Sequence, residues 1–281
     1  MITREATIAD WSKLETFFKI IYRNNHPLHS QVFWEWQYGD AKFGRSFISL
    51  NENEEIVGHV GANFQGGIAW IINVYLTEEC RGKGILSRLY ALARNYFPLG
   101  ATAANEAGLG LYRNMRWIRY HDLVRYVKIN PNCNDKSFDA VCSKIEIKLT
   151  PKYKIDNNEL KHYFNQPSLK GIVLRDESAA VSQEIVGGLR IISFQNCKEL
   201  EDQAWEIGYN WIDYITSWND LQIKDLEKNN WVLDYKSVVP WRLNPVEENK
   251  FCDITFLSEE PLDKDFIVKR YFSDHGRIGS L

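Results

Sequence analysis

A run of nine almost wholly apolar residues, Ile68 to Leu76, constrains the fold of this chain more than any other segment. Such a run is typical of a strand that is buried on both faces of a sheet. The sequence Arg81-Gly82-Lys83-Gly84 follows, and apolar residues at helical spacing then predict a helix over 85–96. A buried strand, a glycine-bearing turn and a helix in this order predict an α/β arrangement.

The turn at residues 81–84 has the composition of an anion-binding loop. Two glycines allow the backbone to approach a ligand closely, and the free N–H groups at a helix start attract negative charge. Arg81 and Lys83 add positive charge, so a pyrophosphate group would fit this loop. Taken alone, the same residues are also explained by an ordinary turn with solvated charges. The signatures GxxxxGK[ST] and GxGxxG are absent, which disfavours a nucleoside triphosphatase and a Rossmann dehydrogenase.

Composition excludes several other classes of protein. The chain has 281 residues, 44% of them hydrophobic, and a formal net charge of −3, which argues against a general nucleic-acid binder. No apolar stretch approaches the length of a membrane span, and the amino terminus lacks the form of a signal peptide, so we expect a cytoplasmic protein. The cysteines form no CxxC pair, so we expect neither a disulfide framework nor a metal site. They are Cys80, Cys133, Cys142, Cys197 and Cys252.

The remaining patterns predict two α/β domains. Periodic apolar residues indicate a helix starting near Asp10, β-prone runs over 46–64 indicate a hairpin, and a second helix is expected around 106–115. Residues 117–129 are interpreted as strands that close the first domain, and the segment 131–135 as a linker. We therefore expect domains at 1–130 and 131–281. In the second domain, Trp211, Tyr214 and Trp218 at helical spacing predict a helix over 199–218, and 266–271 is interpreted as a strand.

Two motifs in the first half resemble those of the GNAT superfamily of acyl-CoA-dependent N-acyltransferases. The pyrophosphate loop of that superfamily, [QR]-x-x-G-x-[GA], is similar to Arg81-Gly82-Lys83-Gly84-Ile85-Leu86, with Leu86 in place of a small residue. The second motif, N-x-x-A-x-x-x-Y-x-x-x-G-F, lies downstream with several departures. It is represented by Asn105, Gly108, Tyr112, Arg116 and Trp117. The resemblance covers roughly residues 1 to 130.

This resemblance implies an α/β (α+β) GNAT fold, in which a mixed, mostly antiparallel and splayed sheet is flanked by helices. It also implies acyl-CoA as co-substrate, without a metal. The strand that contains Val74 would splay from the strand starting near Ala101, so that the Val74 N–H stabilises the oxyanion. Tyr112 would donate a hydrogen bond or a proton to the leaving thiolate. The cofactor would be held by Leu76 at its pantetheine arm and by Arg81, Gly82, Lys83, Gly84, Ile85, Leu86, Asn105 and Tyr112.

Two of these residues also have a purely structural explanation. Tyr112 also fits a core aromatic of its helix, and Asn105 also fits a helix cap. No carboxylate stands out as a general base. The candidates by position alone are His26, His29, His59 and Glu106, each of which also suits a structural role.

The acceptor groove of the superfamily is built by the first helices, which here correspond to residues 25–38. We expect His26, Trp36 and Tyr38 to bind the acceptor, while packing of the helix against the sheet is the competing explanation for the aromatic residues. The second domain contains no second glycine loop, so a second catalytic site is not expected. A degenerate copy of the first domain is one interpretation of it, and acceptor recognition or homo-oligomer contacts are its expected uses. Lys269, Arg270 or Arg277 could contact a phosphate.

The two-part layout and the segment from Asn25 to Tyr38 are similar to bacterial acyltransferases that modify nucleotide-linked amino sugars for surface polysaccharides. The expected reaction joins the acyl group of an acyl-CoA to the amine of a dTDP- or UDP-linked aminodeoxy sugar. Two alternatives stay open. One is an acetyltransferase for another small amine or a peptide, and the other is a noncatalytic acyl-CoA sensor.

Overall fold

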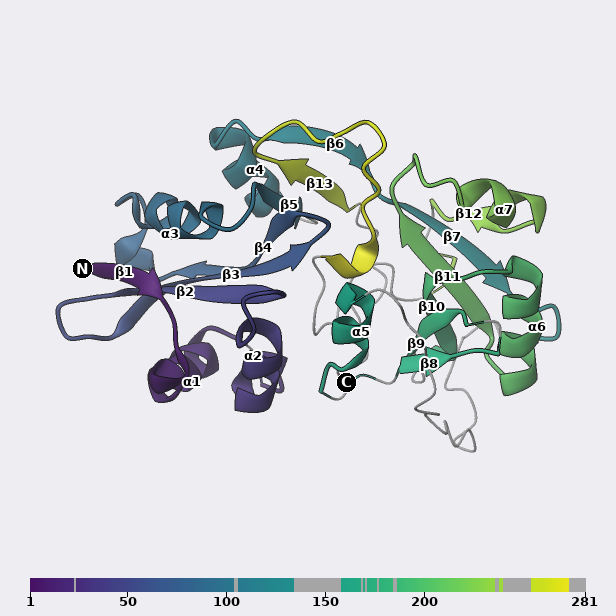
Figure 1. Ribbon diagram of the computed structural model, residues 1–281, viewed down its shortest axis with the longest axis horizontal. Helices are drawn as coiled ribbons and strands as arrows, with labels where there is room; N and C mark the ends of the chain where they lie inside the picture. Colours follow the sequence, from purple (N-terminus) through teal and green to yellow (C-terminus); the bar gives the residue numbers. More distant parts are fainter. Residues whose placement is uncertain are drawn as a thin grey trace.

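Two sheets lie side by side in the computed structural model, and each is flanked by helices (Figure 1). The structure describes residues 1–22, 24–103, 106–133, 158–167, 169, 171–175, 177–183, 186–235, 238–239 and 254–272. Among these residues, no helix is both long enough and apolar enough to cross a bilayer.

The first sheet is mixed, and it runs in the order β1-β2-β3-β4-β5-β13-β6 within the described residues. Its neighbouring strands are antiparallel except for β4 and β5, which are parallel. The strands are β1 (Ile2–Glu5), β2 (Gly44–Leu50), β3 (Ile56–Gln65), β4 (Ile68–Leu76), β5 (Leu99–Ala103), β13 (Thr255–Ser258) and β6 (Ile118–Asp122).

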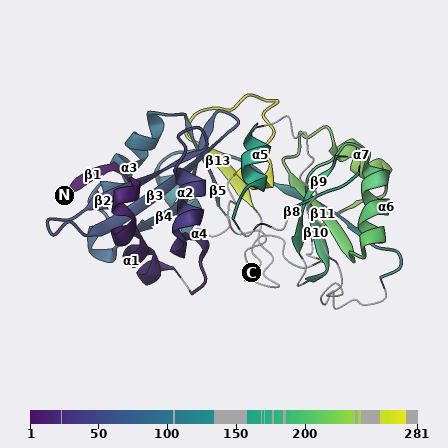
Figure 2. The ribbon, with the colours of Figure 1, turned by 60° about the horizontal axis from the view of Figure 1, so that its bottom comes forward.

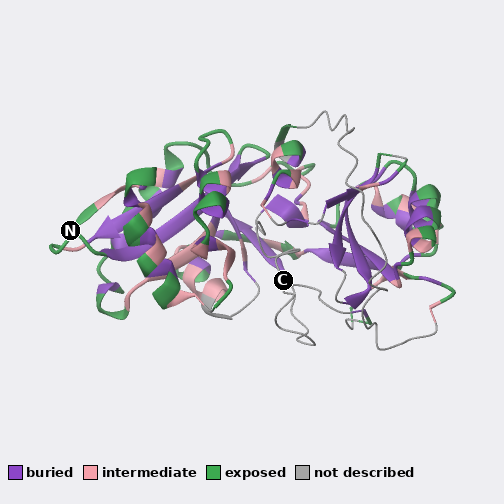
Figure 3. Cartoon of the chain, turned by 90° about the horizontal axis from the view of Figure 1, so that it is seen from below, coloured by how far each residue is buried: buried purple, intermediate pink, exposed green. Residues whose placement is uncertain are grey.

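Helices cover both faces of this sheet, with α1 and α2 on one face and α3 and α4 on the other (Figure 1). Leu89 and Tyr90 of α3 are buried against the strands, and Leu14 and Phe18 of α1 fill the opposite core. Figure 3 shows the same division, because the strands are buried while the outer sides of the helices are exposed. The helices are α1 (Trp11–Ile21), α2 (Gln31–Tyr38), α3 (Ile85–Arg94) and α4 (Glu106–Asn114).

The second sheet has the order β12-β7-β11-β10-β9-β8 in the described part of the chain, and only β10 and β11 are parallel in it. Helices α6 and α7 lie at the far end from the first sheet, and α5 lies between the two sheets (Figure 2). The elements are β7 (Val124–Ile129), α5 (Asn158–Phe164), β8 (Gly171–Val173), β9 (Ala179–Gln183), β10 (Gly188–Ser193), α6 (Cys197–Ile207), β11 (Trp211–Thr216), α7 (Ile223–Lys228) and β12 (Val232–Leu233).

The two sheets share one connectivity. In the first, a parallel pair is joined through α3 and the last two strands are separated by a strand from elsewhere, in the order β4-β5-β13-β6. In the second, α6 joins the parallel pair, and the order is β10-β11-β7-β12. The second half therefore repeats the topology of the first, as one interpretation of the sequence anticipated.

The halves also exchange one strand each. β7 follows β6 in the chain but pairs with β11 and β12 of the second sheet, while β13 lies between β5 and β6 of the first. The expectation that residues 117–129 close the first domain is therefore wrong for 124–129. The division near residue 130 divides the chain, but it does not divide the two sheets.

Two further expectations for the second half are corrected. The helix expected over 199–218 ends at Ile207, because Gly208 adopts φ 104° as its C-cap, and Trp211–Thr216 continues as a buried strand. The strand expected over 266–271 is replaced by a 3₁₀ turn at Arg270–Phe272.

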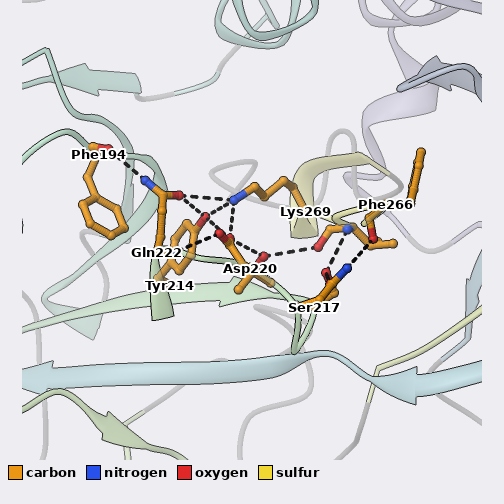
Figure 4. A network of polar contacts seen from close by, with 10 residues as sticks. Phe194, Tyr214, Ser217, Asp220, Gln222, Phe266 and Lys269 are labelled. Atoms are coloured by element: carbon orange, nitrogen blue, oxygen red, sulfur yellow. Dashed lines mark hydrogen bonds and ion pairs between the residues drawn. The ribbon is translucent and has the colours of Figure 1, made fainter. Parts of the chain in front are cut away.

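A polar cluster attaches the carboxy-terminal segment to the second sheet (Figure 4). The Lys269 ammonium contacts the Tyr214 hydroxyl and the Asp220 carboxylate, and Ser217 exchanges hydrogen bonds of 3.0 Å with Val268. Lys269 is therefore engaged in a half-buried ion pair. Arg270 is buried, and Arg277 lies outside the described residues.

Candidate active site

The backbone of β4 changes the side to which its N–H groups point. The Ala69 N–H donates to the Pro98 oxygen at 2.9 Å, toward β5, whereas the Thr77 N–H donates to the Val57 oxygen at 2.9 Å, toward β3. Directions alternate along a regular strand, so residues eight apart would point to the same side. A bulge therefore lies between them.

The bulge is at Asn73. The register between β3 and β4 shifts between the pairs His59–Tyr75 and Gly61–Ile72, and Asn73 has φ 51°. One extra residue reverses the alternation. The N–H and C=O groups of Val74 and Leu76 consequently turn away from β3 and toward the side of β5, and the Arg81 guanidinium accordingly reaches the Leu76 oxygen at 3.4 Å.

Strand β4 separates from β5 at the same place. The two strands pair only at Ala69–Leu99 and Trp70–Gly100, although β4 continues to Leu76. Beyond Gly100, β5 pairs with β13 on its other side. The splayed strands expected from the sequence are present, and the Val74 amide faces the region between them.

The loop before α3 presents a set of backbone donors. Gly82 and Gly84 have φ of 73° and 69°. Gly84 is the N-cap of α3 and has no side chain that could accept a hydrogen bond from the first N–H groups of the helix. The first N–H groups of a helix have no partner within the helix, and its dipole favours an anion there. A Cβ added at either glycine would meet nothing within 4 Å, so these glycines serve the left-handed backbone. The geometry fits a pyrophosphate.

Charge and side-chain placement in the loop agree with that use. Arg81 and Lys83 are exposed, and the Arg81 guanidinium is 3.7 Å from the exposed Glu78 carboxylate. Ile85 is buried and Leu86 packs against the core. The larger Leu86 therefore leaves the backbone amides of the loop uncovered.

We expect the double variant Arg81→Ala/Lys83→Ala to bind coenzyme A roughly 3- to 10-fold more weakly at low salt, because exposed ion pairs contribute about 1 kcal/mol or less each. The loss should shrink in 0.5 M salt, which screens exposed charges. Calorimetric titration at two salt concentrations measures both effects. Lys19→Ala removes an exposed charge of α1 and is the control. An equal affinity of the double variant and the wild type at low salt would contradict this use of the loop.

Tyr112 lies inside the core of the first half. It is 5% exposed, its ring centroid is 4.6 Å from that of Trp117, and Val74 and Leu76 pack against the same cluster. Burial raises the pKa of Tyr112 to about 12, although the neighbouring Tyr90 hydroxyl lowers it in part. The phenol therefore stays protonated at neutral pH and can donate a hydrogen bond.

The second motif keeps its backbone in spite of its departures. Arg116, where the superfamily has glycine, adopts φ 60°. The Trp117 N–H donates to the backbone carbonyl oxygen of Tyr112 at 3.0 Å. The left-handed turn is thus formed without glycine. Asn105 lies outside the described residues, as does the side chain of Glu106.

The residues expected to bind an acceptor have partners within the protein. The His26 ring stacks on Tyr22 with centroids 4.0 Å apart, and its Nδ1 accepts from the Leu28 N–H at 3.2 Å. The Trp36 indole N–H donates to the His162 oxygen of α5 at 2.9 Å. Tyr38 is 2% exposed, which raises its pKa well above the usual range. An acceptor role for these residues stays a prediction.

Two of the candidate bases take part in hydrogen bonds that fix their position. His29 Nε2 lies 3.1 Å from the Phe18 oxygen. His59 is fully buried between Ser46 and the bulge, and burial lowers its pKa to about 4. His59 is therefore neutral and shielded from an incoming amine. Sequence reasoning missed the bulge at Asn73. The local signal for it is an asparagine within an apolar run, because asparagine tolerates a positive φ better than most residues.

The described turn before α6 differs from the loop before α3. At the start of α6 the Asn196 side chain accepts from the Glu199 N–H at 3.1 Å, so that a side chain occupies a donor that is free at α3. No group of three potential metal ligands occurs among the described residues.

Comparisons with known proteins agree with this geometry. Residues 8–115 match the sequence profile of the Acetyltransferase (GNAT) family. No curated protein sequence matches the chain. A candidate acetyltransferase of Pyrococcus horikoshii has a similar structure with 16% identity, 98% of this chain and 95% of that chain covered, and a TM-score of 0.55. It shows that the arrangement of both halves occurs in another protein.

Two further similar structures cover less than half of this chain. A GNAT acetyltransferase of Staphylococcus aureus is 16% identical over 43% of this chain and 85% of that chain, with a TM-score of 0.35. A ribosomal-protein-alanine N-acetyltransferase of Brucella melitensis is 21% identical over 44% of this chain and 88% of that chain, also with a TM-score of 0.35. From the profile match and the fold together, residues 8–115 are an acetyltransferase domain of the GNAT superfamily.

Proposed function

We propose that this chain transfers an acyl group from acyl-CoA to a primary amine, and that the amine belongs to a nucleotide-linked aminodeoxy sugar. The observation that carries the first part is the bulge of β4 beside the splay, because it turns the Val74 and Leu76 amides toward the place of a thioester. The donor-rich loop before α3 follows that strand in the chain, after the short 3₁₀ turn Glu78–Cys80.

The residues divide the binding of acyl-CoA among them. Leu76 offers backbone groups to the pantetheine arm, in the manner of an added strand. The N–H groups of residues 82–86 bind the pyrophosphate, and Arg81 and Lys83 add charge. The Val74 N–H donates to the thioester oxygen.

In the reaction, the lone pair of the amine attacks the thioester carbon and forms a C–N bond. Negative charge develops on the oxygen, which accepts a hydrogen bond from Val74, and such a donor contributes about 2.7–4 kcal/mol in a dry site. The C–S bond then breaks and releases the thiolate. The amine loses its proton to water, and the thiolate takes up a proton from solvent.

Tyr112 acts on the thiolate as a hydrogen-bond donor. A thiol has a pKa near ~8.5, and burial raises the pKa of Tyr112 to about 12. Full proton transfer from the phenol would therefore be uphill by several pKa units, at about 1.4 kcal/mol for each. A hydrogen bond from the intact phenol stabilises the thiolate without that cost.

The choice of acceptor rests on the resemblance of residues 25–38 and of the two-part layout to sugar-modifying enzymes. Helix α2 connects this segment to the second half, because the Trp36 indole donates to His162 and stacks on its ring. A bulky acceptor would meet both halves of the chain there.

A screen of acyl-CoAs against amines tests the proposal. The panel contains dTDP- and UDP-linked amino sugars, an aminoglycoside, spermidine and an amino-terminal peptide, with products detected by mass spectrometry. We expect amides of the nucleotide sugars. Products with the other amines alone would overturn the acceptor and keep the transferase. Acyl-CoA binding without any product would favour the sensor.

A further inference from the structure

We propose that Tyr38 and His59 are positioning residues that hold the left-handed bulge at Asn73, and thereby determine which amide of β4 reaches the acyl oxygen. This inference rests on the proposed function, since it concerns the oxyanion donor of the same reaction. The buried side chains around the bulge come from α2, β2 and β3.

His59 holds the backbone of the bulge. Its Nδ1 lies 2.8 Å from the backbone carbonyl oxygen of Asn73, and its Nε2 lies 2.8 Å from the Ser46 hydroxyl. A carbonyl oxygen only accepts, so Nδ1 carries the proton. The buried ring is neutral, hence Nε2 accepts from Ser46. These two contacts fix the tautomer and the plane of the ring.

Tyr38 holds the side chain of the same residue. The Asn73 Nδ2 donates to the Tyr38 hydroxyl at 2.9 Å. Gly61 of β3 makes this approach possible, because a Cβ there would lie 2.1 Å from the Tyr38 oxygen. The Tyr38 hydroxyl therefore occupies the space that a side chain at position 61 would fill.

Both contacts are made to a residue in the left-handed backbone conformation, which residues other than glycine, asparagine and aspartate rarely adopt. Asn73 has φ 51°, which asparagine tolerates better than most residues and which β-branched residues resist. Without the extra residue, the regular alternation would turn Val74 toward β3 and place Asn73 and Tyr75 on the side of β5. The bulge thus decides the identity of the oxyanion donor.

Substitution of Asn73 separates the backbone from the side chain. Asn73→Val opposes the left-handed conformation, and we expect kcat to fall at least tenfold while the KM for acetyl-CoA changes less than threefold. Asn73→Gly permits that conformation and keeps the carbonyl that His59 binds, but it removes the hydrogen bond to Tyr38, so kcat should lie between those of Asn73→Val and the wild type. The assay uses acetyl-CoA with the amine that the screen identifies.

Asn230→Val is the matched control. Asn230 is an exposed asparagine with φ 59° in the second half, remote from β4 in the sheet order. Its replacement strains the backbone equally but should leave kcat within twofold. A kcat of Asn73→Val that matches this control would overturn the inference.

Nitrogen NMR of the His59 ring supplies a readout that needs no activity. We expect a protonated Nδ1 and an unprotonated Nε2 at pH 7 in the wild type, with loss of the slowly exchanging Nδ1–H signal in Asn73→Val. In Tyr38→Phe the signal should exchange at least tenfold faster, because the bulge loses one of its two holds. A protonated Nε2 in the wild type would overturn the inference.

The two hypotheses fail in different ways. Absence of acyl transfer by the wild type, together with the expected NMR signals, would refute the proposed function and leave the hold on the bulge established. Transfer by the wild type and by Asn73→Val at equal rates would refute the inference alone.

Discussion

Replacing Tyr112 by phenylalanine is expected to lower kcat roughly 10- to 100-fold while the Kd for acetyl-CoA changes little. A hydrogen bond to a charged group contributes about 1.5–3 kcal/mol, and this one forms only when the thiolate leaves. The ring itself stays, so its packing on Trp117 is preserved. Steady-state kinetics and calorimetric titration of acetyl-CoA measure the two quantities.

The control for this variant is Tyr209→Phe. Tyr209 is also a fully buried tyrosine, and its hydroxyl lies 2.7 Å from that of Ser182 in the second half. It should lose stability without losing turnover. Equal kcat values for Tyr112→Phe and the wild type would remove the phenol from the mechanism.

Replacing Asp213 by asparagine is expected to destabilise the chain by about 3–5 kcal/mol, because it removes the negative charge that two buried guanidiniums share. Arg125 keeps its second ion pair, with Asp234 at 3.2 Å. Asp213 of β11 is fully buried and contacts Arg125 of β7 and Arg190 of β10 at 2.7 Å each. Burial raises the pKa of Asp213, but the two guanidiniums outweigh that effect and hold it below its ordinary value. Urea unfolding followed by circular dichroism measures the loss.

The matched surface variant is Asp202→Asn. Asp202 pairs with Lys198 at 2.8 Å on the exposed side of α6, with both side chains more than half exposed. Its loss should leave the unfolding midpoint nearly unchanged, because solvent screens an exposed pair. A similar unfolding midpoint for Asp213→Asn and Asp202→Asn would show that the buried cluster does not hold the second sheet.

This cluster also matters for the first half of the chain. Arg125 lies on β7, the strand that the first half contributes to the second sheet. In exchange, the second half contributes β13 to the first sheet. An apolar cluster with Trp70 of β4, Tyr163 of α5 and Phe256 of β13 fills the space between the sheets. The first sheet is therefore completed by β13, which begins at Thr255, more than 130 residues after β6 ends at Asp122.

Sequence reasoning identified the parts of the site that lie close together along the chain. The apolar strand, the loop from Arg81 to Gly84 and the helix after it are local, although β4 is fully buried only over Ile68–Ile71 and half-buried from Ile72 onward. Glycine suits this loop because φ is positive at Gly82 and Gly84. The superfamily and the α/β fold of the first half follow from these elements, and the profile match and the similar structure confirm them. The nucleotide-sugar acceptor stays a prediction.

The errors arose where periodicity is ambiguous. Trp211 and Tyr214 are three residues apart, which suits a helix, but a strand buried on both faces has no polar alternation to reveal it. The destination of β7 was equally hidden, because a strand's side-chain pattern does not specify which of two similar sheets will accept it.

By itself, the sequence determined that a glycine-bearing turn follows an apolar strand and that Tyr112 lies on the next helix, because glycine conformation and helical spacing act over a few residues. Only the tertiary structure decided which amides of β4 turn toward the side of β5 and which strands complete each sheet. The first outcome arises at Asn73, which contacts Tyr38 and His59, and the second arises where β13 enters between β5 and β6. Contacts between residues far apart in sequence form only when the whole chain packs.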